Sequence, residues 1–191
     1  MAGKNIMIVG VGGQGTLLTS RLLGAALLNE GYDVKVSEVH GMSQRGGSVV
    51  TYVKYGEKIA SPLIEVGEAD IILAFEQLEA ARWLKYMKPD GKLIVNTRKI
   101  DPMTVITGTA EYPEGVIEKL EAAGADIIAA DALALAVEAG SPKAVNVVLV
   151  GIMAAGLELD KEVWINAIKE TVPAKFLELN LKAFELGYNV K

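Results

Sequence analysis

Short apolar runs alternate with segments of helical periodicity along the first three quarters of this chain. Such alternation is typical of βαβ units, in which helices connect neighbouring strands of a parallel sheet. The pattern predicts strands over residues 6–10, 33–38, 48–55, 69–75, 92–96 and 126–130. The Val-, Thr- and Tyr-rich run 48–55 is predicted to be an edge or antiparallel strand. We therefore expect an α/β, Rossmann-like chain with a mostly parallel open sheet and flanking helices.

Apolar residues spaced three and four positions apart mark the helical segments. They predict helices over residues 14–29, 76–87, 132–139, 146–155 and 175–186. Gly31 and Gly187 are expected to end the first and the last of these helices. The helix 146–155 is apolar all round, so it should be buried. No strand is predicted within residues 143–187, which we expect to form a helical C-terminal segment packed on the sheet.

Nothing in the sequence marks a boundary between domains. We find no linker, repeat or low-complexity stretch, so residues 1–191 are expected to form a single domain. Pro-Asp-Gly at 89–91 predicts a turn. Residues 99–115 fit neither the helical nor the strand period and predict a long loop or an extra hairpin.

Composition excludes several kinds of chemistry for this polypeptide. With 0 cysteines it forms no disulfide, thiol nucleophile or cysteine-ligated iron–sulfur cluster, and 1 histidine excludes a site of several histidines. We expect no metal site. The 19 Lys and Arg against 24 Asp and Glu give a net charge of −5, which disfavours nucleic acid as a partner.

Neither a targeting nor a membrane segment is predicted. The residues before the first strand lack the apolar core of a signal peptide, and the apolar stretch 144–157 is too short to span a bilayer. We expect a cytoplasmic protein that does not associate with membranes.

A glycine-rich loop follows the first strand and opens the first helix. It satisfies G-x-G-x-x-G in the context where glycines permit a tight turn and leave helix N–H groups free for an anion. Glu38 follows at the end of the second strand, near where a dinucleotide fold places its ribose-binding carboxylate. The cofactor-binding candidates are Gly10, Gly12, Gly13, Gln14, Gly15 and Glu38. Two interpretations stay open: nucleotide binding, and glycines that only let the helix pack on the sheet.

A second polar loop comes directly after Glu38 and contains the chain's histidine. His40 suits proton transfer near neutral pH and Arg45 suits a phosphate or carboxylate, so these two are the catalytic candidates. The remaining binding candidates in this loop are Gly41, Ser43, Gln44, Gly46 and Gly47. Because the loop faces the glycine-rich loop at the carboxyl ends of strands, we favour a functional role over a solvated turn. Ligand binding and subunit contact both fit that role.

Three further features have structural explanations. Glu76, Glu79 and Arg82 are expected to form a solvated helix face, since they are spaced three residues apart. Asp131 is predicted to cap the helix that follows it. Asn146 lies within an apolar helix, where a hydrogen bond to a neighbouring loop is its commonest explanation.

The two loops together resemble a known family. The run from Gly10 to Gly15 and the run from Glu38 to Val49 are similar to those of gamma-type subunits of 2-oxoacid:ferredoxin oxidoreductases, and most similar to the small (beta) subunits of the indolepyruvate enzymes. The run His-Gly-Met-Ser-Gln-Arg-Gly-Gly is the more specific of the two motifs. The resemblance extends over nearly the whole chain.

This resemblance implies a reaction and a set of partners. A 2-oxo acid, here an aryl pyruvate such as indolepyruvate, would add to thiamine diphosphate and lose CO2. Electrons would pass through iron–sulfur clusters to ferredoxin, and coenzyme A would take the acyl group. The family places thiamine diphosphate and the clusters on a large partner subunit, so the present chain would be a non-redox subunit that is inactive alone.

Within that frame, two roles for the loops remain open. The glycine-rich loop and Arg45 would face the partner's active centre and seat coenzyme A phosphates, or both loops would serve only to contact the partner. The isolated chain is expected to self-associate through the surface meant for its partner. The alternative function is a stand-alone, NAD-like nucleotide-binding regulatory module.

Overall fold

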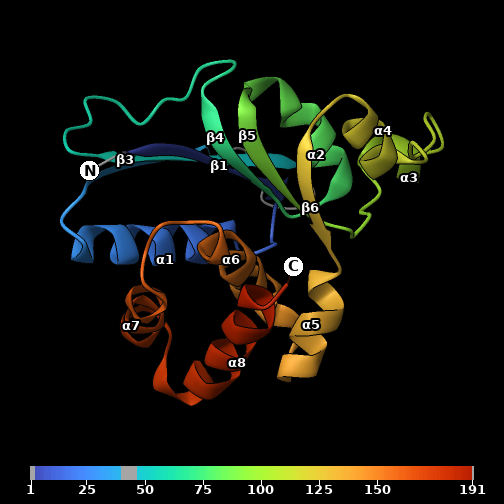
Figure 1. Cartoon of the computed structure of the whole chain (residues 1–191). Coiled ribbons are helices and arrows are strands. Elements are labelled where there is room, and N and C mark those ends of the chain that lie inside the picture. Colours follow the sequence, from blue (N-terminus) through green and yellow to red (C-terminus); the bar gives the residue numbers. More distant parts are fainter. Residues whose placement is uncertain (1–2, 40–46, 191) are drawn as a thin grey trace.

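The computed structural model describes residues 3–39 and 47–190, which form a six-stranded sheet with helices on both faces (Figure 1). The strands lie in the order β2-β3-β1-β4-β5-β6. Their bounds are β1 Lys4–Val11, β2 Asp33–Val39, β3 Ser48–Gly56, β4 Ala69–Ala74, β5 Met87–Asn96 and β6 Asp126–Ala130. Strands β1, β4, β5 and β6 run parallel. The predicted α/β class with a mostly parallel open sheet is confirmed.

Strand β3 interrupts the parallel order. It is antiparallel to β1 on one side and to β2 on the other, so the antiparallel alternative is confirmed and the edge alternative is wrong. The edge position belongs to β2, whose pairing with β3 joins Val36 to Val53. In a dinucleotide-binding fold the second strand lies directly beside the first. Here β3 separates them.

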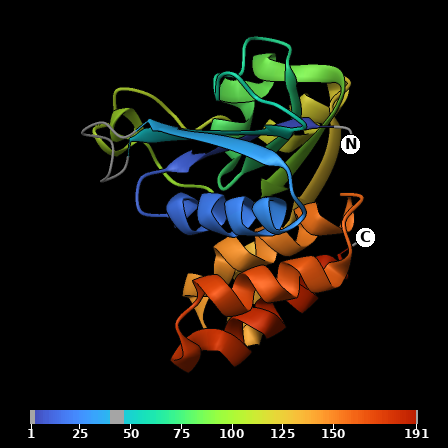
Figure 2. The ribbon, with the colours of Figure 1, turned by 90° about the vertical axis from the view of Figure 1, so that its left-hand side faces the viewer.

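The helices cover the two faces of the sheet unequally (Figures 1 and 2). Helix α1 and the C-terminal helices lie on one face, and α2 and α4 lie on the other. The bounds are α1 Thr16–Asn29, α2 Gln77–Trp83, α3 Met103–Ile106, α4 Val116–Ala122, α5 Ala132–Ala139, α6 Val145–Ala155, α7 Lys161–Thr171 and α8 Leu177–Tyr188. Short 3-10 turns occupy Leu84–Tyr86, Pro142–Ala144 and Ala174–Phe176.

Alternation along β1 divides the apolar core in two. Ile6 and Ile8 belong to the larger cluster, with residues of α1 and the C-terminal helices. Met7 and Val9 belong to the smaller cluster, with residues of α2 and α4. All four side chains are fully buried, as a central strand covered on both faces requires.

The C-terminal segment is helical, as predicted, and its helices α6 and α7 contact α1. Residues Val145 to Ala154 of α6 are all buried, which confirms the expectation for a helix that is apolar all round. Gly187 does not end the last helix: it lies inside α8, where a Cβ atom would come within 2.0 Å of the Val148 carbonyl oxygen. Gly151 on α6 faces α8 in the same way. These glycines let the two helix backbones touch.

Two predicted boundaries near β5 are wrong. Helix α2 ends at Trp83, and the chain continues through the 3-10 turn into β5, which begins at Met87. The turn predicted at 89–91 is therefore part of β5, in the stretch where its register with β4 shifts. Gly91 permits this path, because a Cβ there would lie 2.9 Å from the Ala69 carbonyl oxygen.

Other boundaries follow from local backbone chemistry. Helix α1 begins at Thr16 because Gly15 before it adopts a left-handed conformation, and Gly31 ends it with φ of 81° as predicted. Residues 99–115 form a long loop that carries the short helix α3, so the loop alternative is confirmed and the extra hairpin is wrong. Helix α4 lies outside the predicted helices. Within residues 3–39 and 47–190, no helix is long and apolar enough to cross a membrane.

We expect Gly187→Ala to destabilise the protein by about 1–3 kcal/mol, because its methyl group would push α8 away from α6. Gly24 is the matched control: it lies inside α1 with open space around its Cβ position. Gly24→Ala should stabilise the protein by about 0.5–1 kcal/mol, since alanine favours the helix. Urea unfolding of both variants measures the two changes, and equal effects would refute the close-packing explanation.

Candidate functional site

The glycine-rich loop joins the end of β1 to the start of α1, at the carboxyl edge of the parallel strands. Gly13 and Gly15 have φ of 94° and 86°, a region that side chains with a Cβ rarely adopt. Gly15 is the N-cap of α1, and no described side chain caps that helix. Backbone N–H groups at a helix start of this kind favour an anion.

Gln14 fixes this loop to the neighbouring strand. The Val11 N–H donates to Gln14 Oε1 over 2.6 Å, and Gln14 Nε2 donates to the Phe75 carbonyl over 3.0 Å. The same carbonyl accepts from Asn96 Nδ2 at 3.1 Å, and Asn96 Oδ1 accepts from the Ala132 N–H at 3.2 Å. The Gln14 amide, a cofactor-binding candidate, thus bonds to backbone within the protein.

Helix α6 supports the loop from the opposite side. Asn146 Nδ2 donates to the Gly15 carbonyl at 3.4 Å, which confirms the predicted hydrogen bond to a neighbouring loop. A Cβ on Gly15 would lie 2.9 Å from that nitrogen. The positive φ of Gly15 and the nearby Asn146 amide together favour glycine at position 15, and the hydrogen bond attaches the start of α1 to α6.

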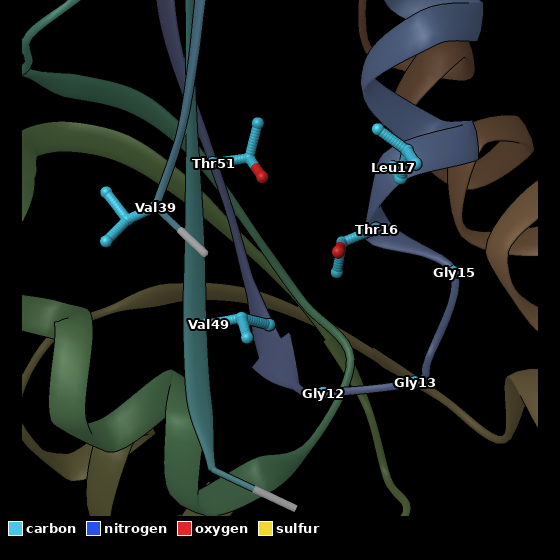
Figure 3. Close-up of a pocket in the computed structure, with 8 residues that line it drawn as sticks. All are labelled: Gly12, Gly13, Gly15, Thr16, Leu17, Val39, Val49 and Thr51. Carbon is cyan, nitrogen blue, oxygen red and sulfur yellow. The ribbon is translucent and has the colours of Figure 1, made fainter. Parts of the chain in front are cut away.

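A pocket of about 360 Å³ opens between the glycine-rich loop and β3 (Figure 3). The loop and the start of α1 form one wall, and the ends of β2 and β3 form the other. It is lined by Gly12, Gly13, Gly15, Thr16, Leu17, Val39, Val49 and Thr51. Because its polar lining consists of hydroxyl and backbone groups, this pocket suits a neutral or anionic ligand.

A second cavity, of about 520 Å³, lies on the other side of the same loop. Its walls include Gly12 to Gly15 together with Arg98 and Lys143, both of which are exposed. Two cationic side chains beside a helix start form a favourable site for phosphate groups. Neither residue was predicted as a candidate. Arg98 follows β5 by two residues, so its place at the carboxyl edge was a usable signal.

The second loop is described only at its end. His40, Gly41, Ser43, Gln44, Arg45 and Gly46 lie outside the described residues. Gly47 is described, and its carbonyl accepts a hydrogen bond from the Gly12 N–H at 3.0 Å. The two predicted loops therefore meet at Gly12 and Gly47.

Glu38 lies apart from the position that a ribose-binding carboxylate would take beside the first strand. Because β3 intervenes, Glu38 pairs with Thr51 across β3 and not with a residue of β1. Its Oε1 accepts a hydrogen bond from Ser20 Oγ of α1 at 2.6 Å. In this structure the Glu38 carboxylate contacts the first helix.

Glu76 and Glu79 are buried, so the prediction of a solvated face is wrong for both. Glu76 is 1% exposed and caps α2 by accepting from the Glu79 N–H at 3.0 Å. Glu79 is 4% exposed and accepts from Arg82 Nε at 3.1 Å, Trp83 Nε1 at 3.2 Å and Ser48 Oγ. Only Arg82 is exposed as expected. Helical spacing alone did not reveal that α2 turns these carboxylates toward β3 and the 97–113 segment.

Glu76 also holds the segment after β5. Its Oε1 accepts from the Ile100 N–H at 3.2 Å and from the Tyr112 hydroxyl. Burial, together with the hydrogen bond to Glu76, raises the pKa of Tyr112, which therefore stays protonated and donates. A cavity of about 460 Å³ lies beside this network, between Ser48 and residues 100–105.

The remaining site expectations concern helix caps and metals. Asp131 caps α5 by accepting from the Ala134 N–H at 2.9 Å, as predicted. In the part of the chain that the structure describes, no group of three or more His, Cys, Asp and Glu residues could hold a metal ion.

Comparison with known proteins places this geometry in a family. The family described as pyruvate ferredoxin/flavodoxin oxidoreductase matches residues 5–190. The chain is 45% identical over 190 residues to the indolepyruvate oxidoreductase subunit IorB of Thermococcus kodakarensis, covering 96% of this chain and 93% of that protein.

Solved structures share the fold. The keto/oxoacid ferredoxin oxidoreductase gamma subunit of Geobacter sulfurreducens is 25% identical with a TM-score of 0.71, covering 97% of this chain and 96% of that one. The 2-oxoglutarate:ferredoxin oxidoreductase of Magnetococcus marinus, solved with 2-oxoglutarate, coenzyme A and succinyl-CoA bound, is 18% identical with a TM-score of 0.73. The match covers 100% of this chain but 31% of that longer chain.

These matches extend over the sheet, both loops and the C-terminal helices, and they confirm the resemblance drawn from the two motifs. The chain belongs to the pyruvate ferredoxin/flavodoxin oxidoreductase family.

Proposed function

We propose that this chain is the small, non-redox subunit of an oxidoreductase that converts an aryl pyruvate such as indolepyruvate, coenzyme A and oxidised ferredoxin into acyl-CoA, CO2 and reduced ferredoxin. The observation that carries the proposal is its 45% identity to an indolepyruvate oxidoreductase subunit over nearly the full length of both. The cysteine-free sequence supports the division of labour, because it offers no thiolate to an iron–sulfur cluster.

The redox cofactors then belong to a larger partner. Thiamine diphosphate supplies the decarboxylation chemistry when bound, and iron–sulfur clusters carry the two electrons singly to ferredoxin. The residues of this chain would form one wall of the active site on the partner subunit. The isolated chain is accordingly proposed to be inactive.

The glycine-rich loop is proposed to receive the phosphates of coenzyme A. Three features support this role: the uncapped start of α1, the left-handed backbone of Gly13 and Gly15, and the cavity shared with Arg98 and Lys143. Arg45, outside the described residues, would add a third cationic group from the neighbouring loop. The chain's own part is thus to orient the acyl acceptor.

The assembly is tested by purifying the tagged chain from its native host without oxygen. We expect a larger protein with iron–sulfur absorbance to co-purify, and the eluate to reduce a viologen dye with indolepyruvate and coenzyme A. Comparing 2-oxo acids identifies the substrate class, and the tagged chain alone should be inactive. A colourless preparation without a partner would contradict the proposal and make nucleotide binding, measured by calorimetry with NAD(H), the leading interpretation.

Coenzyme A seating predicts a selective kinetic effect. In the assembled enzyme, Arg98→Ala with Lys143→Ala should raise the KM for coenzyme A about tenfold, because a charge-assisted hydrogen bond contributes about 1.5 kcal/mol. The KM for indolepyruvate should not change, and neither constant should change in the control Lys169→Ala on α7.

Arg45→Ala separates the two roles of the second loop: a raised KM for coenzyme A indicates ligand binding, and a poor yield of complex indicates subunit contact. An assembled Arg45→Ala enzyme with both constants unchanged would rule out a role for Arg45 in seating the ligand.

A further inference from the structure

Helix α3 presents apolar side chains to solvent. Met103 is 64% exposed and Ile106 is 66% exposed, and their spacing of three residues puts them on one side of the helix. No residue of α3 is buried. Helix α3 therefore contributes little to the apolar core, so its exposed apolar side chains have another explanation.

The segment that carries α3 is nevertheless anchored. One buried carboxylate, that of Glu76, accepts hydrogen bonds from Ile100, which precedes α3, and from Tyr112, which follows it. A carboxylate is costly to bury unless its hydrogen bonds are made, and Glu76 makes them to this segment and to α2. An exposed helix held at both ends by a buried group is a preorganised surface.

The position of this surface connects it to the candidate site. Figure 2 shows the α3 segment beside the end of β2 and the start of β3, beyond the carboxyl edge of the parallel strands. The cavity of about 460 Å³ runs from Gly47 and Ser48 to Met103 and Thr104. At this edge Val39, which ends β2, is also 53% exposed. Met103 thus lines the same cavity as Val11, which ends β1, and Gly47, which ends the second loop.

We infer that Met103 and Ile106 dock this chain onto its large partner subunit. This inference rests on the proposed function. The occupant follows from two observations: the surface adjoins the loops proposed to face the partner's active centre, and a chain with this fold makes up 31% of a longer oxidoreductase chain in Magnetococcus marinus. In that longer chain, the region with this fold needs a surface that packs against the rest of the chain. In the present protein, the exposed apolar pair suits an apolar patch on the large subunit.

Co-purification of variants with the large subunit tests the contact. Met103→Glu with Ile106→Glu should lower recovery of the large subunit at least tenfold, with circular dichroism and Tm of the isolated chain unchanged. The matched control is Leu63→Glu with Val66→Glu, because these residues are 59% and 62% exposed and lie between β3 and β4 at the opposite edge of the sheet. The control should recover the partner normally.

The other outcomes are distinct. If the wild-type chain recovers no large subunit, the proposed function fails and the docking inference fails with it. If the wild-type chain and the Met103/Ile106 variant recover it equally, or if the control loses it to the same extent, only the docking inference fails. It is also overturned if the variant keeps its partner and merely turns a dimer of the isolated chain into a monomer, since the occupant is then a second copy.

Tyr112→Phe tests the anchor without altering the exposed surface. Removing the hydroxyl releases one of the attachments to Glu76, so α3 should lose preorganisation and the partner should dissociate about threefold faster. Surface-plasmon measurement of dissociation from the immobilised large subunit reports the effect. Tyr52→Phe on β3 is the control and should dissociate at the wild-type rate. An unchanged rate for Tyr112→Phe would show that the hydrogen bond to Glu76 does not preorganise α3 for the partner.

Discussion

One backbone carbonyl, that of Phe75, joins the elements on which the candidate site depends. It accepts from the Gln14 side chain, which holds the glycine-rich loop, and from Asn96 at the end of β5. Asn96 in turn accepts from the start of α5. Asn96 is fully buried and Gln14 is half-buried, and a buried amide needs hydrogen-bond partners, so these bonds fix the ends of β1, β4 and β5 together. The loop conformation therefore follows from the sheet edge as much as from its glycines.

The same edge carries a second buried network, built on carboxylates. Glu79 links α2 to the start of β3, and Glu76 links it to the segment that contains α3. Together with the Gly12–Gly47 hydrogen bond, these contacts tie the described part of the second loop and the segment after β5 to neighbouring elements at the carboxyl edge. A surface assembled from several loops can present one fixed shape only when the loops are connected in this way.

The sequence predicted where the strands and helices lie better than it predicted which of them lie side by side. Among the described residues, continuous apolar runs located the strands buried on both faces, and alternation located the half-exposed edge strand β2. The placement of β3 between β1 and β2 left no such signal, since strand order depends on pairing across the whole chain. Gly187 was mistaken for a helix end because a glycine needed for close helix contact looks the same in sequence as one needed for a turn.

The candidate site was likewise predicted only in part, because contacts between distant segments leave no local signal in the sequence. The glycine-rich loop and Gly47 come together as expected, and Asn146 and Asp131 make the hydrogen bonds predicted for them. The burial of Glu76 and Glu79 was not predicted, because i, i+3 charged residues on a helix usually face solvent. Here the segment after β5 covers Glu76, and Ser48 at the start of β3 contacts Glu79. The binding role of Glu38 stays a prediction: its distance from the glycine-rich loop in sequence matches a dinucleotide fold, but β3 lies between its strand and β1, and its carboxylate accepts from Ser20 on α1.

These features favour a positioning role over a chemical one. Gln14, Asn96, Glu76 and Glu79 use their polar atoms on neighbouring groups of the protein, and such satisfied side chains are poor nucleophiles or bases. Among the described residues, the edge offers another molecule the uncapped start of α1, the cations Arg98 and Lys143, and the apolar pair on α3. In the proposed function, the fixed geometry of this edge would be the chain's contribution to catalysis, since a rigid wall orients a substrate without taking part in bond making.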